Sequence, residues 1–107
     1  MKTLRTWGGK SSFRYSGLVT TGTEIEYGEG FRSKASISKE QYSALRTYFS
    51  KREVSIGTSR TNPPAGSVGE WLMQNVKRTA LASYVGPILI LEKCASKGAA
   101  EDRIKFL

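Results

Sequence analysis

Histidine is absent from this 107-residue chain, and cysteine occurs only once. Histidine is the most common proton shuttle at neutral pH and the most common metal ligand, so an active site here would need other side chains. The single thiol, Cys94, follows an apolar run and is expected to be a buried, unreactive side chain. These absences argue against an enzyme, and we expect neither a cofactor nor a bound metal.

Long hydrophobic runs are also missing. The longest apolar stretch, residues 81–91, is interrupted by Ser83, Gly86 and Pro87. It is shorter than the roughly 20 residues that cross a bilayer. No positively charged start leads into an apolar segment with a cleavage site. We therefore expect a cytoplasmic protein without a membrane span.

Positive charge is what the chain has in excess. It contains 17 Lys and Arg against 9 Asp and Glu, a net charge of +8. Most of this surplus lies in residues 1–52, where ten cations accompany four acids. The 38% hydrophobic content and the chain length are those of one folded domain. The composition predicts a small basic domain that binds a polyanion, because cations displace the counterions of such partners.

Alternating polar and apolar residues predict a β-hairpin. The alternation covers residues 23–27 and 31–37, with a glycine-rich turn between them. Acidic residues of the first strand would face Arg32 and Lys34 of the second strand. Residues 1–22 are rich in Gly, Ser and Thr, and we expect them to be turn-rich or partly mobile.

Two capping boxes predict two helices. Ser38 and Ser67 are each followed, three residues later, by a Gln or Glu whose side chain can complete the cap. The first helix should run to about Phe49, with apolar residues at spacings of three and four. The end of the second helix is open, because Gly69 weakens its first turn and residues 79–83 fit a helix or a strand.

Three further strands complete the predicted fold. Residues 54–56 form a short alternating segment, and residues 88–91 are a run of four aliphatic side chains that follows Gly86 and Pro87. Residues 103–107 alternate again and would close a hairpin with residues 88–91. The sequence thus predicts an α+β fold in a small single domain. Its antiparallel sheet has about four to five strands, with two helices packed on one face.

The loop of residues 57–67 is the first candidate binding site. It leads to the start of the second helix, where free N–H groups and a partial positive charge can hold an anion. Arg60 would act as the charged clamp, and Thr58, Ser59 and Thr61 would add hydroxyl donors. Ser67, at the helix start, is assigned to the same site. The competing structural interpretation is that prolines stiffen the loop and Ser67 only caps its own helix. Neither nucleotide-binding glycine motif, Walker or dinucleotide, is present.

Cations interspersed with aromatic residues are the second candidate. Arg14, Arg32 and Lys34 lie among Trp, Phe and Tyr residues, and nucleic-acid surfaces combine phosphate-binding cations with rings that stack on bases. On the second helix, Lys77 and Arg78 would reach phosphates or base edges. The competing interpretation places the aromatic rings in the core and leaves the cations to solvent. A helix-turn-helix is poorly supported, because a strand and a long loop separate the two predicted helices.

We therefore expect a small non-enzymatic protein that binds nucleic acid or another polyanion. The alternative is a protein-interaction module or a homo-oligomeric accessory protein, for example a homodimer. Cations gathered on one face favour the first class, and an exposed apolar patch favours the second. The residues assigned to anion binding are Arg14, Arg32, Lys34, Thr58, Ser59, Arg60, Ser67, Lys77 and Arg78.

Overall fold

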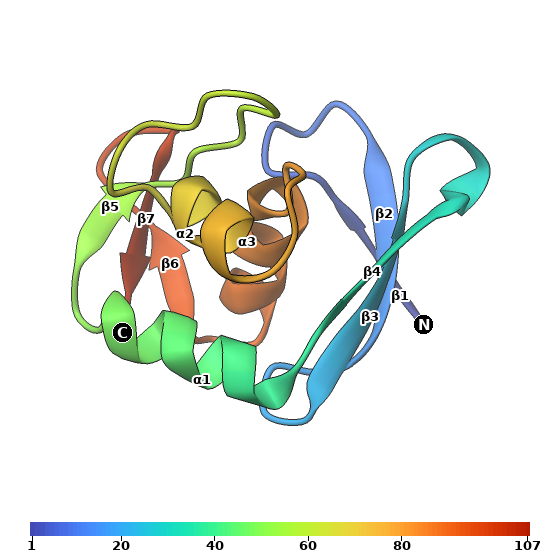
Figure 1. Ribbon diagram of the computed structural model, residues 1–107, viewed down its shortest axis with the longest axis horizontal. Coiled ribbons are helices and arrows are strands. Elements are labelled where there is room, and N and C mark those ends of the chain that lie inside the picture. Colours follow the sequence, from blue (N-terminus) through green and yellow to red (C-terminus); the bar gives the residue numbers. More distant parts are fainter.

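The computed structural model describes all 107 residues and contains two antiparallel sheets with helices between them (Figure 1). Strands β1 to β4 form one sheet in chain order, and the second sheet has the order β5-β7-β6. In chain order the elements are β1 (Lys2–Arg5), β2 (Ser12–Leu18), β3 (Gly22–Tyr27), the 3₁₀ turn η1 (Glu29–Phe31), β4 (Ser33–Ile37), α1 (Lys39–Tyr48), β5 (Glu53–Ser55), α2 (Val68–Asn75), α3 (Ala82–Leu91), β6 (Ala95–Lys97) and β7 (Arg103–Phe106).

The α+β class is confirmed, but its arrangement differs from the prediction. There are two sheets instead of one, and three helices instead of two. The short strand predicted at residues 54–56 is present as β5, but it belongs to the second sheet. A single core of 22 buried residues joins both sheets and all three helices. The chain therefore packs as one unit around one hydrophobic centre.

The turn-rich segment predicted for residues 1–22 is wrong where β1 and β2 form. Strand β2 is an inner strand, paired with β1 on one side and β3 on the other. Phe13 and Tyr15 are fully buried on its inner face, while Arg14 and Ser16 alternate toward the outer face. The alternation of buried and exposed residues was not recognised in the sequence, because Ser and Gly dominate this stretch.

The hairpin predicted over residues 23–37 is confirmed, with β3 antiparallel to β4. Its second strand begins only after η1, so Arg32 lies outside the strand. Lys34 stands opposite Glu26 in the register. Glu26 nevertheless forms its ion pair with Arg14 on the other neighbouring strand. The expected cross-hairpin charge pairing is thus replaced by a pair between β2 and β3.

Both predicted helix starts are confirmed. The Ser38 hydroxyl accepts the Gln41 N–H at 3.0 Å, and the Gln41 side chain accepts the Ser38 N–H at 2.9 Å. The Ser67 hydroxyl accepts the Glu70 N–H at 3.1 Å, whereas the Glu70 carboxylate accepts the N–H of Gly66. The second box therefore closes one residue further back than the standard motif.

The strand predicted at residues 88–91 is wrong, because these residues form the second half of α3. Pro87 lies inside this helix, where it cannot bond the carbonyl four residues earlier. That carbonyl belongs to Ser83, and it accepts the Trp7 N–H at 2.9 Å instead. A distant segment thus supplies the donor that proline lacks, and the helix continues. None of the three helices has the length and apolar character needed to cross a bilayer.

The predicted closing hairpin has a different first strand. Strand β7 pairs with β6, with Ala95 opposite Phe106, and not with residues 88–91. Helix α3 is apolar on nearly all sides because it lies in the centre of the fold, where Val85, Ile88 and Leu89 are fully buried. Such a helix has no polar face, so its sequence resembles a buried strand.

Two glycines allow the helices to approach their neighbours. A Cβ atom on Gly69 would lie 1.8 Å from the carbonyl oxygen of Gly57, and the Gly69 N–H donates to the Ile56 carbonyl at 2.9 Å. A Cβ atom on Gly86 would lie 2.6 Å from the Trp7 ring. Gly69 weakens the helix by propensity alone, but the packing requires it.

Candidate polyanion-binding site

The loop predicted to bind an anion is already bonded to its own chain. Ser67 is buried and its hydroxyl caps Glu70, while the Gly69 N–H is bonded to Ile56. The Ser59 hydroxyl accepts the two N–H groups that follow in its own turn, at 3.3 and 3.0 Å. The bonds from Gly69 and Glu70 occupy donors that an anion would need at the start of α2. The hydrogen bonds of this loop are those expected if it is a structural connection and Ser67 only caps its own helix.

Arg60 is exposed, and its charge acts on Tyr84, which belongs to an aromatic cluster. The Tyr84 ring centroid is 4.7 Å from that of Tyr27 and 5.2 Å from that of Phe13. Burial, helped by the neighbouring Tyr27, raises the pKa of the Tyr84 hydroxyl, and the Arg60 guanidinium opposes this rise. Thr58 is half-buried nearby in sequence and makes no side-chain hydrogen bond.

Lys77 and Arg78 lie beyond α2, which ends at Asn75, so their predicted place on the helix is wrong. The structure brings Lys77 to the edge strand β4, where its Nζ atom donates to the Lys34 carbonyl at 3.0 Å. Arg78 and Arg32 are exposed and form no ion pair. Lys34 and Lys77 therefore share one edge of the first sheet.

Arg14 and Trp7 are engaged by neighbours. The Arg14 guanidinium pairs with Glu26 and lies 4.6 Å from the Phe31 ring centroid. The Lys97 Nζ atom lies 4.5 Å from the Trp7 ring centroid. Neither the Arg14 charge nor the Trp7 ring is free to meet a nucleic acid without losing an internal contact.

Most of the positive charge is nevertheless unpaired. Only two of the 17 cationic side chains, Arg14 and Arg103, have a carboxylate within 4.0 Å. The other 15 form no ion pair. These 15 cations therefore have no carboxylate partner inside the protein.

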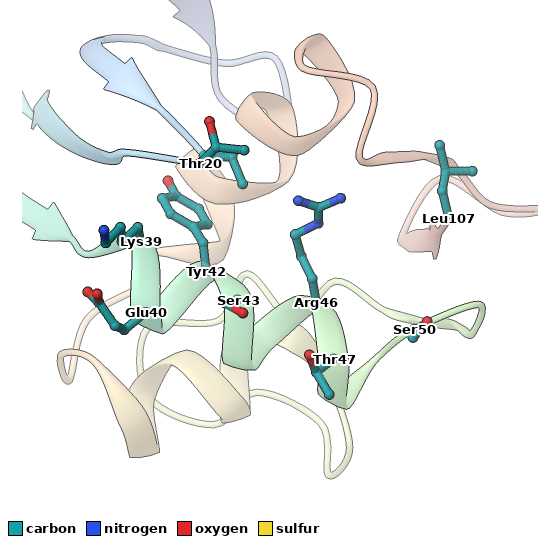
Figure 2. Close-up of a pocket in the computed structure, with 10 residues that line it drawn as sticks. Thr20, Lys39, Glu40, Tyr42, Ser43, Arg46, Thr47, Ser50 and Leu107 are labelled. Carbon is teal, nitrogen blue, oxygen red and sulfur yellow. The ribbon is translucent and has the colours of Figure 1, made fainter.

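An open groove of about 670 Å³ runs along α1 (Figure 2). In Figure 2, Arg46 extends into this hollow between Thr20 and Leu107, while Lys39 and Glu40 lie at the first turn of the helix. We call this hollow the α1 groove. It is lined by Val19, Thr20, Lys39, Glu40, Tyr42, Ser43, Arg46, Thr47, Ser50 and Leu107.

The α1 groove combines cations with hydroxyl groups. Lys39 and Arg46 are seven residues apart, about 10 Å along a helix axis, which is the rise of about three nucleotides. Four Ser and Thr side chains line the space around them: Thr20, Ser43, Thr47 and Ser50. Glu40 is the one carboxylate among the lining side chains. Arg46 extends into the hollow away from this carboxylate (Figure 2).

Tyr42 and Ser43 are two polar side chains that line the α1 groove. The Tyr42 hydroxyl shares a hydrogen bond of 2.7 Å with Thr23. No hydrogen bond joins Glu40 to Ser43, although both line the groove. The structure also has no cluster of three acidic or cysteine side chains able to hold a metal ion.

Glu92 fixes the wall of the groove opposite α1. Its carboxylate accepts the Tyr15 hydroxyl at 2.8 Å and the Val19 N–H at 2.9 Å. Burial, together with the bond to Glu92, raises the pKa of Tyr15. Cys94 is buried as predicted; burial raises the pKa of its thiol, and Arg46 opposes this rise. The carboxylate thereby ties the end of α3 to the Val19 segment.

The sequence contains a signal for the α1 groove that the prediction left unused. Lys39, Ser43, Arg46 and Ser50 follow spacings of four, three and four, which place them on one face of a helix. This polar stripe lies beside the apolar stripe that marks the core side. The opposite wall comes from distant segments, and no local pattern could reveal it.

No protein-family model, no curated protein and no solved structure matches this chain. The site must therefore be judged by its own geometry and charge.

Proposed function

We propose that this protein binds nucleic acid without catalysing a reaction on it, and that the α1 groove holds part of the phosphate backbone. The observation that carries this proposal is the near absence of internal charge pairing, with 15 of 17 cations lacking a carboxylate partner. A nucleic acid that meets these cations releases its condensed counterions, which favours binding.

The choice of the α1 groove rests on the local balance of charge. Residues 39–52 include four exposed cations and one carboxylate. The groove is open, so a continuous chain can lie along it, and hydroxyl groups of this kind donate to phosphate oxygens. The contacts it offers are to the backbone, so we expect weak sequence preference.

The test is binding to mixed-sequence duplex DNA, single-stranded DNA and RNA, followed by fluorescence anisotropy at several salt concentrations. The logarithm of the affinity should fall linearly with the logarithm of the salt concentration. Arg46→Gln should weaken duplex binding and reduce the slope by about 0.9, the value for one lost phosphate contact. Glu40→Gln should strengthen binding, because Glu40 supplies the one side-chain carboxylate among the lining residues.

Arg78→Gln is the matched control, because Arg78 is also an exposed arginine without an ion-pair partner. It should change the affinity and the slope less than Arg46→Gln. Absence of binding at the lowest salt concentration would overturn the proposed function. A larger effect at Arg78 would overturn the assignment to the α1 groove and place the contact at the loop after α2.

A further inference from the structure

A second hollow lies where the end of β1 meets the second half of α3 and strand β6. We call it the Trp7 cleft; its volume is about 290 Å³. Leu91, the last residue of α3, lines this hollow with 46% of its surface exposed. The cleft is lined by Arg5, Thr6, Trp7, Pro87, Ile90, Leu91 and Lys97.

The cleft has an apolar floor and two cations on its rim. Arg5 and Lys97 line it, and neither forms an ion pair. Arg5 donates to the Gly9 carbonyl at 3.3 Å, and Lys97 lies over the Trp7 ring. No carboxylate is among the lining side chains; Glu101 contributes only its main-chain carbonyl, which accepts the Trp7 indole N–H at 2.8 Å. An occupant would meet apolar surface and unpaired positive charge together.

Trp7 is held in place before any ligand arrives. Its main-chain N–H is bonded to Ser83, its indole N–H is bonded to Glu101, and its ring lies against Gly86. A site fixed in this way loses little conformational entropy when it binds.

We propose that the Trp7 cleft docks an acidic peptide segment of a protein partner. One large apolar side chain of the partner would insert between Trp7, Ile90 and Leu91, and flanking carboxylates would pair with Arg5 and Lys97. The volume supports an anchoring side chain, because pockets for whole small molecules span about 300–1,000 Å³. This inference is independent of nucleic-acid binding at the α1 groove.

The same features disfavour two other occupants. A second copy of this chain, related by a two-fold axis through the cleft, would bring Arg5 and Lys97 against their own counterparts. A nucleic-acid base stacks on a whole ring face, and Lys97 lies over the Trp7 ring, whereas the proposed anchor would contact Ile90, Leu91 and only the edge of Trp7. The charge of the rim therefore points to a partner of opposite charge, and the apolar floor points to a side chain.

The test is a titration of the full ¹⁵N-labelled chain with the peptide acetyl-EDLFDE-amide, followed by two-dimensional NMR. The Trp7 indole signal should shift, and the Trp71 indole signal provides an internal control. Two matched peptides separate the contributions: EDSGDE keeps the charge without the anchor, and KSLFSK keeps the anchor without the acids. EDSGDE should bind at least about tenfold more weakly, because burial of one large apolar side chain contributes that factor. KSLFSK should also bind more weakly, because its lysines would meet Arg5 and Lys97.

Leu91→Ser should lower the affinity for the EDLFDE peptide by about tenfold. Its control is Leu18→Ser, since Leu18 is equally exposed at 45% and does not line the cleft. Lys97→Glu should weaken binding more than Lys51→Glu, the control for a general change of charge. Equal affinities for EDLFDE and EDSGDE, or an unchanged Trp7 signal at saturation, would overturn the proposal. Arg46→Gln should leave peptide binding intact.

Discussion

The bridge from Glu92 to Tyr15 and Val19 gives a quantitative test of how the groove wall is held. Both donors are buried, with exposed fractions of 0% for Tyr15 and 2% for Val19. Both bonds converge on one carboxylate at the end of α3, at 2.8 and 2.9 Å. Removal of this carboxylate leaves two buried donors without a partner.

Glu92→Ala should lower the free energy of unfolding by about 2–5 kcal/mol, because each unsatisfied donor costs about 1–3 kcal/mol. Tyr15→Phe removes one bond to a charged acceptor and should cost about 1.5–3 kcal/mol. In the Glu92→Ala background the same change should cost far less, because the hydroxyl has already lost its acceptor. The two effects should therefore be coupled by about 1–3 kcal/mol.

The measurement is urea unfolding of the four proteins of this double-mutant cycle. Thermal melting provides a check, since about 1 kcal/mol corresponds to about 4 °C for a domain of this size. Glu40→Ala is the control, because Glu40 is an exposed carboxylate at the same groove and should change stability by at most about 0.5 kcal/mol. Additive effects of the two substitutions would refute the reasoning.

Three further outcomes are expected. Gly69→Ala should destabilise the fold, because the Cβ atom of the alanine would meet the Gly57 carbonyl. Helix propensity alone would favour alanine by about 1 kcal/mol. The measurement is urea unfolding, and Gly8→Ala is the control, because a Cβ atom on Gly8 would lie in open space. Burial raises the pKa of Tyr42. The contribution of Tyr42 to the free energy of unfolding is therefore fully present below about pH 10 and should fall above that pH by about 1.4 kcal/mol per pH unit. Urea unfolding of Tyr42→Phe at alkaline pH should show a smaller dependence of stability on pH. Cys94 should react with a thiol reagent far more slowly in the folded state than in urea, and equal rates would contradict its burial.

Local patterns in the sequence determined the start of α1 and α2, the hairpin of β3 and β4, and the net charge. Ser38 and Ser67 cap their helices through bonds that span three residues, so nearby sequence is enough to specify them. The alternation over residues 23–37 likewise specifies which side chains face the core. The polar stripe that includes Lys39 and Arg46 was also present in the sequence.

Tertiary contacts decided the rest. Helix α3 persists through Pro87 because Trp7, far away in the chain, bonds the carbonyl of Ser83. The α1 groove gains its second wall because Glu92 holds Val19. Each of these features depends on a donor or acceptor supplied by a distant segment, and such pairing leaves no periodic signal in the sequence. The sequence by itself determined the elements with local hydrogen bonds and the surplus of charge, and only the packed chain decided which distant segments lie beside that charge.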